Sequence, residues 1–453
     1  MQDLTQGSIA KHLMQMAAFI AAGMLVQTFY ILIDLYFVSR LGKEAIAGVG
    51  AAGNAMFIVM ALTQVLSIGA VTLIAQAVGR KDQADANLVF NQSMLLSALC
   101  GVAVIVGGYL TSNAYLGSIS ADAATLAAGE TYLHWYLPGL ALQFAIVGMG
   151  SALRGTGIVK PTMVVQSLTV ILNIILAPVL IAGWLTGHPL GVLGAALAST
   201  LSIAVGVLIL ILYFARLEHY VAFNAAQWRV HFATWRRLLN IGLPAGGEFV
   251  LMFVIITVIY GAVRQFGAHA QAGVSIGFRS MQSIFLPAMA VAFAVSPIAG
   301  QNFGAKLAGR VRETFRSALI IGTMIMLALT LLCKLSPQSL VKIFSTDPAV
   351  VAVGVVYLQI ASWNFVCNGV IFTCSALFQG LGNTWPALMS SGMRILTFVM
   401  PALWLARQPW VKIEDFWYLS VASITLQAIV SYLLLRGEMR RRLNFPPVAA
   451  ATA

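Results

Sequence analysis

Two acidic residues lie inside long apolar stretches of this chain, where a charged group is costly. Asp34 interrupts the run ILIDLYFVSR (31–40), and Glu248 interrupts GLPAGGEFVLMF (242–253). Moving a charge into hydrocarbon costs several kcal/mol, so such residues usually serve a function. A carboxylic acid held away from water can keep a proton near neutral pH, and a carboxylate attracts cations. The two residues therefore indicate reversible binding of a proton, a metal cation or an organic cation.

The composition indicates that helices within a membrane position these acids. The chain has 453 residues, of which 60% are hydrophobic and 9% are charged, whereas soluble proteins are about 25% charged. Long apolar runs recur along its length, which is typical of a multi-pass membrane protein. The net charge of +12 does not indicate nucleic acid binding, because the basic residues lie in short loops between these runs. The four cysteines have no spacing that predicts a metal or redox site.

The apolar runs predict twelve membrane-spanning helices, with both termini in the cytoplasm. They are expected within 13–39, 52–78, 91–112, 128–153, 161–184, 190–215, 238–264, 275–303, 315–336, 348–378, 385–407 and 415–436. With the N-terminus inside, 17 Lys and Arg residues lie on the inner side and 7 on the outer side. Cytoplasmic loops carry such an excess of basic residues. The polar start MQDLTQGSIAKHL leads directly into the first span, so no removed signal peptide is predicted.

The second half of the chain repeats the first at a spacing of 225 residues. RLGKEAIAGV (40–49) matches QFGAHAQAGV (265–274), IAQAVG (74–79) matches AGQNFG (299–304), and SALRGTGIVKP (151–161) matches SALFQGLGNTWP (375–386) with one insertion. Each half holds six predicted helices, an even number, so the halves share one orientation, as in secondary transporters. The sequence therefore predicts an all-α membrane protein with a six-helix lobe over 1–217, a cytoplasmic linker over 218–237, and a second six-helix lobe over 238–453.

The chain resembles the multidrug and toxic compound extrusion (MATE) transporters, in particular the DinF-like branch. The resemblance covers nearly the whole length and is carried by IDLYFVSRLG, AQAVGRKD, RGTG followed by KPT, LNIILAP, GVLGAALAST and GQNFGA. It implies two lobes around a cavity from which cationic or amphipathic compounds are exported by alternating access, in exchange for H⁺ or Na⁺. It also implies a monomer in the bacterial inner membrane, with no enzymatic activity and no cofactor beyond the coupling ion.

The resemblance further implies an ion-coupling site formed by Asp34, Asn173 and Ser199. Many relatives have Asp where this chain has Ala177, one turn after Asn173. Because a Na⁺ site needs several oxygen ligands, the missing carboxylate favours H⁺ as the coupling ion, with Na⁺ at Asp34 as the alternative. Interpretations without an ion also stand: Asp34 could reach water or pair with Arg40, and the two other residues could form only interhelical hydrogen bonds.

The predicted substrate cavity contains Glu248, Met252, Arg279, Arg394 and Gln27. Glu248 lies about 16 Å of helix rise beyond Arg237, close to the bilayer midplane. Relatives place a helix 7 glutamate near the position of Met252, so Glu248 is a displaced match. Its alternative role is to pair with Arg279 or Arg394, which need a counter-charge or water in a membrane.

Three other function classes compete with a cation exporter. The segment GVSIG (273–277) fits the G-x-S-x-G hydrolase motif but begins a membrane helix instead of following a strand, so an intramembrane enzyme is disfavoured. A flippase for lipid-linked precursors would share the two-lobed architecture, and the two arginines could bind its anionic headgroup. A channel is disfavoured, because the repeat and the deep acids suit alternating access.

Overall fold

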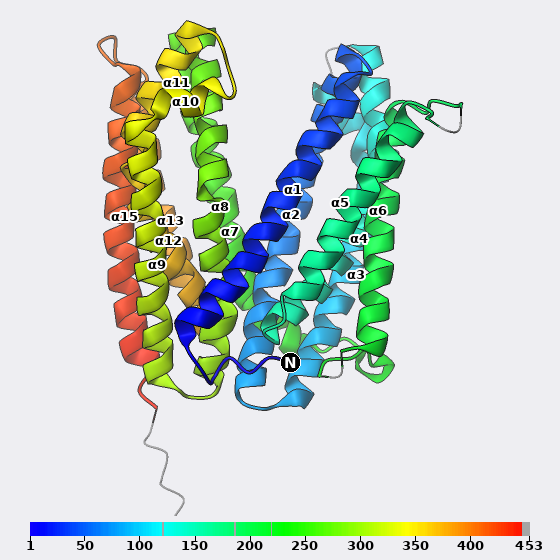
Figure 1. Ribbon diagram of the computed structural model, residues 1–453, viewed down its shortest axis with the longest axis vertical. Helices are drawn as coiled ribbons and strands as arrows, with labels where there is room; N and C mark the ends of the chain where they lie inside the picture. The colour runs from blue at the N-terminus through cyan, green and yellow to red at the C-terminus, as the bar shows by residue number, and fades with distance from the viewer. Residues whose placement is uncertain (120–121, 185–186, 219, 446–453) are drawn as a thin grey trace, which may run out of the picture. The chain divides into compact units, whose positions relative to one another are not determined.

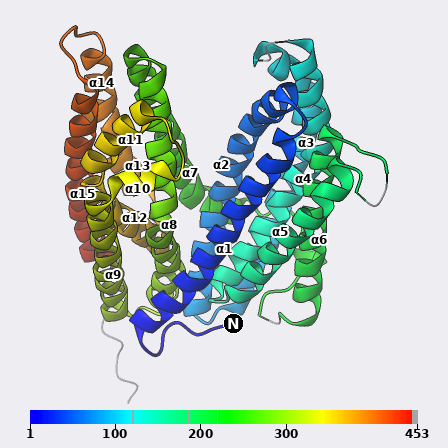
Figure 2. The same cartoon turned by 45° about the horizontal axis from the view of Figure 1, so that its top comes forward.

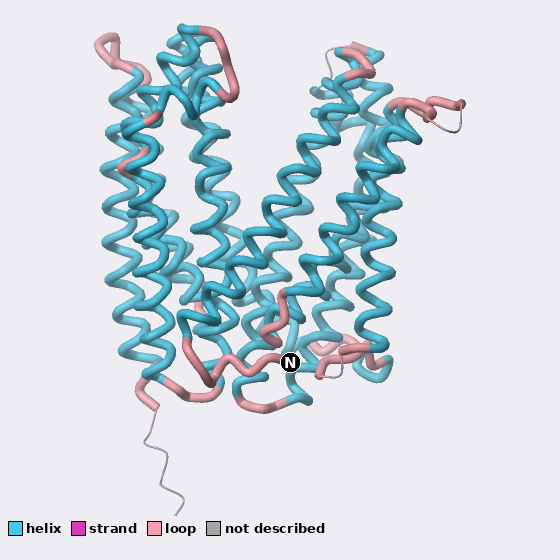
Figure 3. Tube along the Cα trace, in the orientation of Figure 1, coloured by secondary structure: helices cyan, strands magenta, loops and turns pink. Residues whose placement is uncertain are grey.

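The computed structural model describes the chain except at residues 120–121, 185–186, 219 and 446–453. Within the helices, the side chains at positions 31, 34, 35, 54, 55 and 119 also lie outside the described part. The described residues form helices and loops, with no strand (Figure 3). Twelve described helical segments are long and apolar enough to cross a membrane. The predicted all-α fold with twelve spans is therefore confirmed.

The chain divides into two compact units. The first unit comprises residues 1–3 and 19–242, and the second comprises residues 4–18 and 243–453. Two of these boundaries fall within helices, namely α1 (Ile9–Ser39) and α7 (Phe232–Val263). The segment 218–237, predicted as the linker between lobes, belongs to the first unit.

The first unit is built around α4. Its helices are the greater part of α1, then α2 (Lys43–Gly79), α3 (Gln83–Ile119), α4 (Ala123–Gly155), α5 (Lys160–Ile181), α6 (Val192–Arg216), the 3₁₀ turn η1 (Ala225–Gln227) and the start of α7. α4 contacts α2, α3 and α6, and α5 packs against α6 (Figures 1 and 2). Leu133, Leu137, Leu140 and Phe144 are at most 3% exposed. Their spacing of three and four residues gives α4 one continuous buried face.

The second unit is built around α12. Its helices after α7 are η2 (Arg264–Phe266), α8 (Ala268–Gly304), α9 (Ala308–Leu335), α10 (Pro337–Lys342), α11 (Pro348–Ala361), α12 (Asn364–Leu381), α13 (Trp385–Arg394), the π-helical turn η3 (Ile395–Val399), α14 (Met400–Leu405) and α15 (Ile413–Arg442). α12 contacts α8, α9 and α15.

The predicted single helix over 348–378 is wrong. The structure has two helices there, α11 and α12, and only α12 is long enough to count as a span. The chain turns at Ser362 and Trp363 between them. The hydroxyl group of Thr330 donates to the carbonyl oxygen of Ser362 at 3.1 Å. A side chain that enters the backbone ladder in this way is a common cause of a helix break.

The backbone repeats at the spacing that the sequence predicts. α2 and α8 each have 37 residues and begin 225 positions apart. After each of them a lysine adopts a positive φ, 59° at Lys81 and 60° at Lys306. Gly157 and Gly382 likewise have φ of 83° and 76°. Positive φ is uncommon for a residue other than glycine, so the matching lysine conformations are strong support for an internal duplication.

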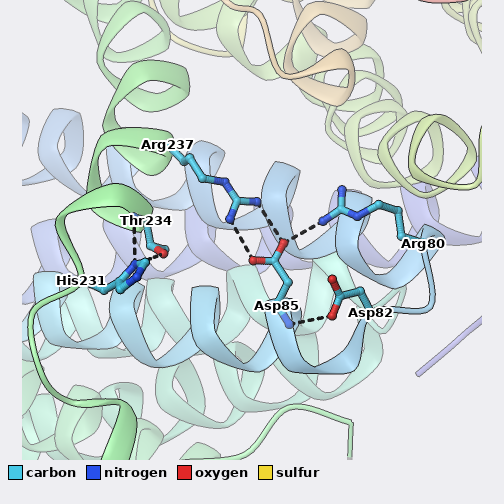
Figure 4. Close-up of polar contacts among 6 residues, drawn as sticks. All are labelled: Arg80, Asp82, Asp85, His231, Thr234 and Arg237. Atoms are coloured by element: carbon cyan, nitrogen blue, oxygen red, sulfur yellow. Dashed lines mark hydrogen bonds and ion pairs between the residues drawn. The ribbon is translucent and has the colours of Figure 1, made fainter.

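The start of α7 is fastened to the start of α3 by Asp85. The Arg237 guanidinium donates to both carboxylate oxygens, with Nη1 to Oδ1 at 2.8 Å and Nη2 to Oδ2 at 2.9 Å (Figure 4). Arg80 Nη2 contacts Oδ2 at 2.7 Å, and Asp82 Oδ1 accepts from the Asp85 amide at 3.0 Å. Such a bidentate pair fixes orientation as well as distance, so it anchors α7 to the first unit.

Replacing Asp85 with Asn is expected to destabilise the first unit by about 1 kcal/mol, because two guanidinium groups lose their carboxylate. The loss is limited because the Arg237 side chain is 41% exposed, so water screens it. The midpoint of thermal unfolding in detergent measures the effect. Glu44→Gln is the matched control: it removes the same charge from an exposed side chain that has no ion pair among the described residues. Equal midpoints for both variants would contradict the anchoring role.

Candidate coupling site and substrate-binding residues

Three polar side chains meet in the first unit, from α1, α5 and α6. The Tyr30 hydroxyl donates to Ser199 Oγ at 2.7 Å, and Asn173 Nδ2 donates to the same oxygen at 3.3 Å. Asn173 and Ser199 are 0% exposed. The structure therefore brings together two of the three residues predicted for ion coupling, and it adds Tyr30, which the sequence analysis did not single out.

Close packing of α5 against α6 lets Asn173 reach Ser199. Two glycines of α6 lie on either side of Ser199 and face α5. A Cβ at Gly194 would lie 2.4 Å from the Leu180 carbonyl oxygen, and a Cβ at Gly206 would lie 2.5 Å from Thr169 Cγ2. Neither distance is possible for a real side chain, so glycine is required for this helix spacing.

The cluster has an unused acceptor at its centre. Asn173 Oδ1 is buried and has no hydrogen-bond partner among the described residues. Buried amide oxygens are nearly always paired, and an exception calls for an explanation. A carbonyl oxygen accepts from a proton donor or coordinates a cation. An ion-coupling site needs an oxygen of this kind, either to accept a hydrogen bond from a protonated acid or to coordinate a metal cation.

The side chain of Asp34, the first residue predicted for coupling, lies outside the described part of the structure. Its backbone belongs to α1, four residues after Tyr30. Positions four apart in a helix lie on the same face. Ala177, where the sequence resemblance implies a missing carboxylate, is 0% exposed and lies one turn after Asn173 on α5.

The other deep acid, Glu248, is hydrogen-bonded across two helices of the second unit. Ser375 Oγ on α12 lies 3.2 Å from Oε1 and 3.1 Å from Oε2 of this α7 residue. Glu248 is half-buried. No ion pair joins it to Arg279 or Arg394 among the described residues. The interpretation of Glu248 as a partner of either arginine therefore has no support in these contacts.

The remaining residues of the predicted cavity lie on several helices. Met252, one turn after Glu248, is 50% exposed. Arg279 is exposed on α8, and Gln27 is exposed on α1 in the first unit. Within the described residues of the second unit, no ion pair joins Glu248 to Arg279. Their common membership of one cavity therefore stays a prediction.

Arg394 occupies an irregular point of the second unit. It is half-buried at the end of α13, where the helix widens into the π-helical turn η3. Its Nε is buried without a partner among the described residues, and its Cζ lies 5.5 Å from the centre of the Phe398 ring. π-Helical turns occur frequently at functional sites, which keeps Arg394 among the candidates.

Matching serines of the two halves contact groups of opposite charge. Ser375 belongs to the repeated SAL segment, where its counterpart is Ser151. Arg154 Nη2 donates to Ser151 Oγ at 3.3 Å and to Ser67 Oγ at 2.7 Å, whereas Ser375 contacts Glu248. The repeat could have revealed Ser375 as a candidate, since both copies of the segment hold a serine at this position. The acid itself belongs to the second half alone.

A family profile described as MatE matches residues 20–179 and 244–405, which together are more than half of the chain. The chain belongs to the MatE family. As a MATE protein it is a membrane transporter and not an enzyme, as the sequence predicted. The two matched ranges are similar in length and lie in the two halves of the chain.

Two curated MATE relatives are aligned over almost their whole length. The multidrug export protein MepA of Staphylococcus haemolyticus is 25% identical over 442 residues, which cover 97% of this chain and 96% of that protein. The probable multidrug resistance protein NorM of Thermotoga maritima is 26% identical over 465 residues, which cover 96% and 94%.

A solved transporter of the MOP superfamily from Pyrococcus furiosus matches the fold. It has a TM-score of 0.90 at 23% identity and covers 98% of both chains. That protein is described as having a binding pocket of reverse polarity, which suggests a different function. The similarity therefore supports the fold only. The class of transported compound has to be inferred from the side chains of this chain.

Proposed function

We propose that the chain is a secondary active efflux transporter that exports cationic or amphipathic compounds in exchange for H⁺. The observation that carries this proposal is the hydrogen-bonded cluster of the half-buried Tyr30 with the buried Asn173 and Ser199. Tyr30 precedes Asp34 by one turn of α1. A second acid, Glu248, has a hydroxyl partner but no cationic one among the described residues. The multidrug export named for MepA and the probable multidrug resistance named for NorM agree with a cationic cargo.

In the proposed mechanism, Asp34 alternates between a protonated and an ionised state. When protonated, it can donate a hydrogen bond to an acceptor such as Asn173 Oδ1; when ionised, it needs donors or a cation instead. The two states therefore favour different packing around α1, which couples the proton gradient to alternating access. Na⁺ is the weaker candidate, because Ala177 supplies no second carboxylate and Ser199 Oγ already accepts two hydrogen bonds.

The setting of this activity is part of the same proposal. We place the chain in a bacterial inner membrane as a monomer of the DinF-like branch, with both termini in the cytoplasm and with lobes over 1–217 and 238–453. The excess of basic residues on one side supports this orientation.

A lipid-linked precursor flippase is the second candidate. It is favoured by Arg279 and Arg394, which have no acidic partner among the described residues. Two unpaired guanidinium groups in the second unit suit an anionic headgroup as well as they suit gating.

Transport by the purified chain in liposomes separates these functions. A H⁺ gradient and a Na⁺ gradient are imposed in turn, and movement of a fluorescent organic cation is followed beside that of a fluorescent anionic lipid. We expect only the H⁺ gradient to drive the cation. Movement of the lipid without movement of the cation would favour the flippase over the efflux transporter. Movement of the cation driven only by the Na⁺ gradient would overturn proton coupling.

A further inference from the structure

Three unpaired arginines lie close in sequence around the segment that joins α6 to α7. Arg216 ends α6, Arg229 lies in the connecting segment, and Arg236 lies near the start of α7; all three are exposed. None has an ion pair among the described residues, in contrast to the neighbouring Arg237, which binds Asp85. Together with Trp228 and Phe232, which are 41% and 76% exposed, we call them the basic rim.

The backbone of the basic rim is held in place by α3. Gln92 Nε2 donates to the carbonyl oxygens of Gln227 and Arg229 at 2.6 and 2.8 Å, and Gln92 Oε1 accepts from the His231 amide at 3.0 Å. Asn91 Oδ1 accepts from Trp228 Nε1 at 3.1 Å. Both α3 side chains are 0% exposed. Residues 227–231 are therefore held in place, and the Arg229 side chain projects from a preorganised support.

The exposed face of α6 locates the rim relative to the membrane. Val205, Leu208 and Leu212 are 39%, 55% and 47% exposed, and their spacing of three and four residues puts them on one side of the helix. On a membrane span, an exposed apolar face contacts acyl chains. Arg216 follows on the same side, four residues after Leu212 and at the last residue of α6. It therefore lies where hydrocarbon gives way to headgroups, the depth at which Trp and Arg are typical.

No acidic side chain of the segment neutralises these arginines at the surface. Glu218, two residues after Arg216, is only 4% exposed and accepts a hydrogen bond from the Tyr220 amide at 2.9 Å. We propose that the basic rim binds the phosphate headgroups of anionic phospholipids. A guanidinium group can donate two parallel hydrogen bonds to two oxygens of one phosphate. The neighbouring Trp228 and Phe232 suit the adjacent interfacial layer.

The affinity of the full chain for fluorescent phosphatidylglycerol in detergent tests this proposal, with phosphatidylcholine as the neutral lipid. Each arginine near an anionic surface contributes about fivefold in affinity, so the triple variant R216Q/R229Q/R236Q should lose at least tenfold for phosphatidylglycerol and nothing for phosphatidylcholine. The triple variant with lysine at the same positions should retain most of the affinity. The control K43Q/R407Q/K412Q removes three exposed charges elsewhere and should bind like the wild type.

The same assay identifies the results that overturn the proposal. Unchanged phosphatidylglycerol affinity in the glutamine variant, or an equal loss in the control, would contradict a site at the rim. Displacement of the lipid by millimolar inorganic phosphate would indicate a free-anion site instead. Size-exclusion profiles and melting midpoints in phosphatidylcholine must match the wild type; if the glutamine variant fails to fold, single arginine variants with an expected fivefold loss each replace it.

Discussion

Replacing Asp34 with Asn is expected to slow export driven by a proton gradient by a large factor. Asn has nearly the same shape as Asp, but it cannot release or take up a proton. The side chain at position 34 would therefore be neutral in both the outward-facing and the inward-facing state. Coupling free energies are typically 1–3 kcal/mol, which is about 5- to 150-fold, and the initial rate of gradient-driven transport in liposomes should fall by a factor in this range. Binding of the organic cation to the detergent-solubilised variant should change little, since the proposed role of Asp34 is to carry the proton.

Two controls make the Asp34 result specific. Glu44→Gln removes an exposed acid of the same unit and should transport normally. Tyr30→Phe removes the hydroxyl that donates to Ser199 at 2.7 Å and should reduce the rate by a smaller factor, because it alters the surroundings of the acid and not the acid itself. Full gradient-driven transport by Asp34→Asn would remove this residue from the mechanism, whereas slow transport with unchanged proton release on cation binding would reduce it to a structural role.

The fold was predictable because each of its main features leaves a local pattern. Apolar runs define the spans, and the matching blocks at a spacing of 225 residues correspond to matching backbone conformations at Lys81 and Lys306. The break between α11 and α12 leaves no such pattern. It occurs where the Thr330 hydroxyl, 32 residues away, bonds to the Ser362 carbonyl oxygen, and hydropathy does not register a tertiary hydrogen bond.

The candidate sites were predictable only in part, for a similar reason. Asn173 and Ser199 could be named from the resemblance, and the structure joins them. Tyr30 and Ser375 were missed, because a tyrosine or serine in a membrane helix is common. The repeat marks Ser375 as a shared position, but its contact with an acid is visible only in the structure. The partner of Ser375 is 127 positions away in sequence. Proximity of this kind is set by helix packing and cannot be read from spacing.

The contrast between the two halves gives the duplicated transporter two different polar sites. In the first unit, Ser151 lies beside the guanidinium of Arg154; in the second, its counterpart Ser375 lies beside the carboxylate of Glu248. If the two halves had kept the same function after the duplication, the charged group beside the serine would be expected to have the same sign in both. The change of sign suggests that the second unit has specialised in attracting a cation, and this can be tested at Glu248 itself.

Replacing Glu248 with Gln is expected to weaken binding of monovalent organic cations by about tenfold or more, because an uncompensated carboxylate in a poorly solvated place attracts a cation strongly. Glutamine retains a carbonyl oxygen that can accept from Ser375, so the α7–α12 contact should survive. Neutral amphipathic compounds should bind equally to both proteins. Fluorescence titration of a cationic and a neutral ligand of similar size measures the difference.

The acidity of the medium provides an independent test of the same carboxylate. In the wild type, protonation of Glu248 removes the negative charge, so cation affinity should decrease as pH falls. In the glutamine variant this dependence should be smaller, because only the contribution of Asp34 is left. Ser375→Ala should weaken cation binding less, since it removes a hydrogen bond and leaves the charge, and Ser151→Ala in the first unit is its matched control. If Glu248→Gln lowers the melting midpoint but leaves both the affinity and its pH dependence intact, then Glu248 only joins α7 to α12, and the cation must be recognised elsewhere.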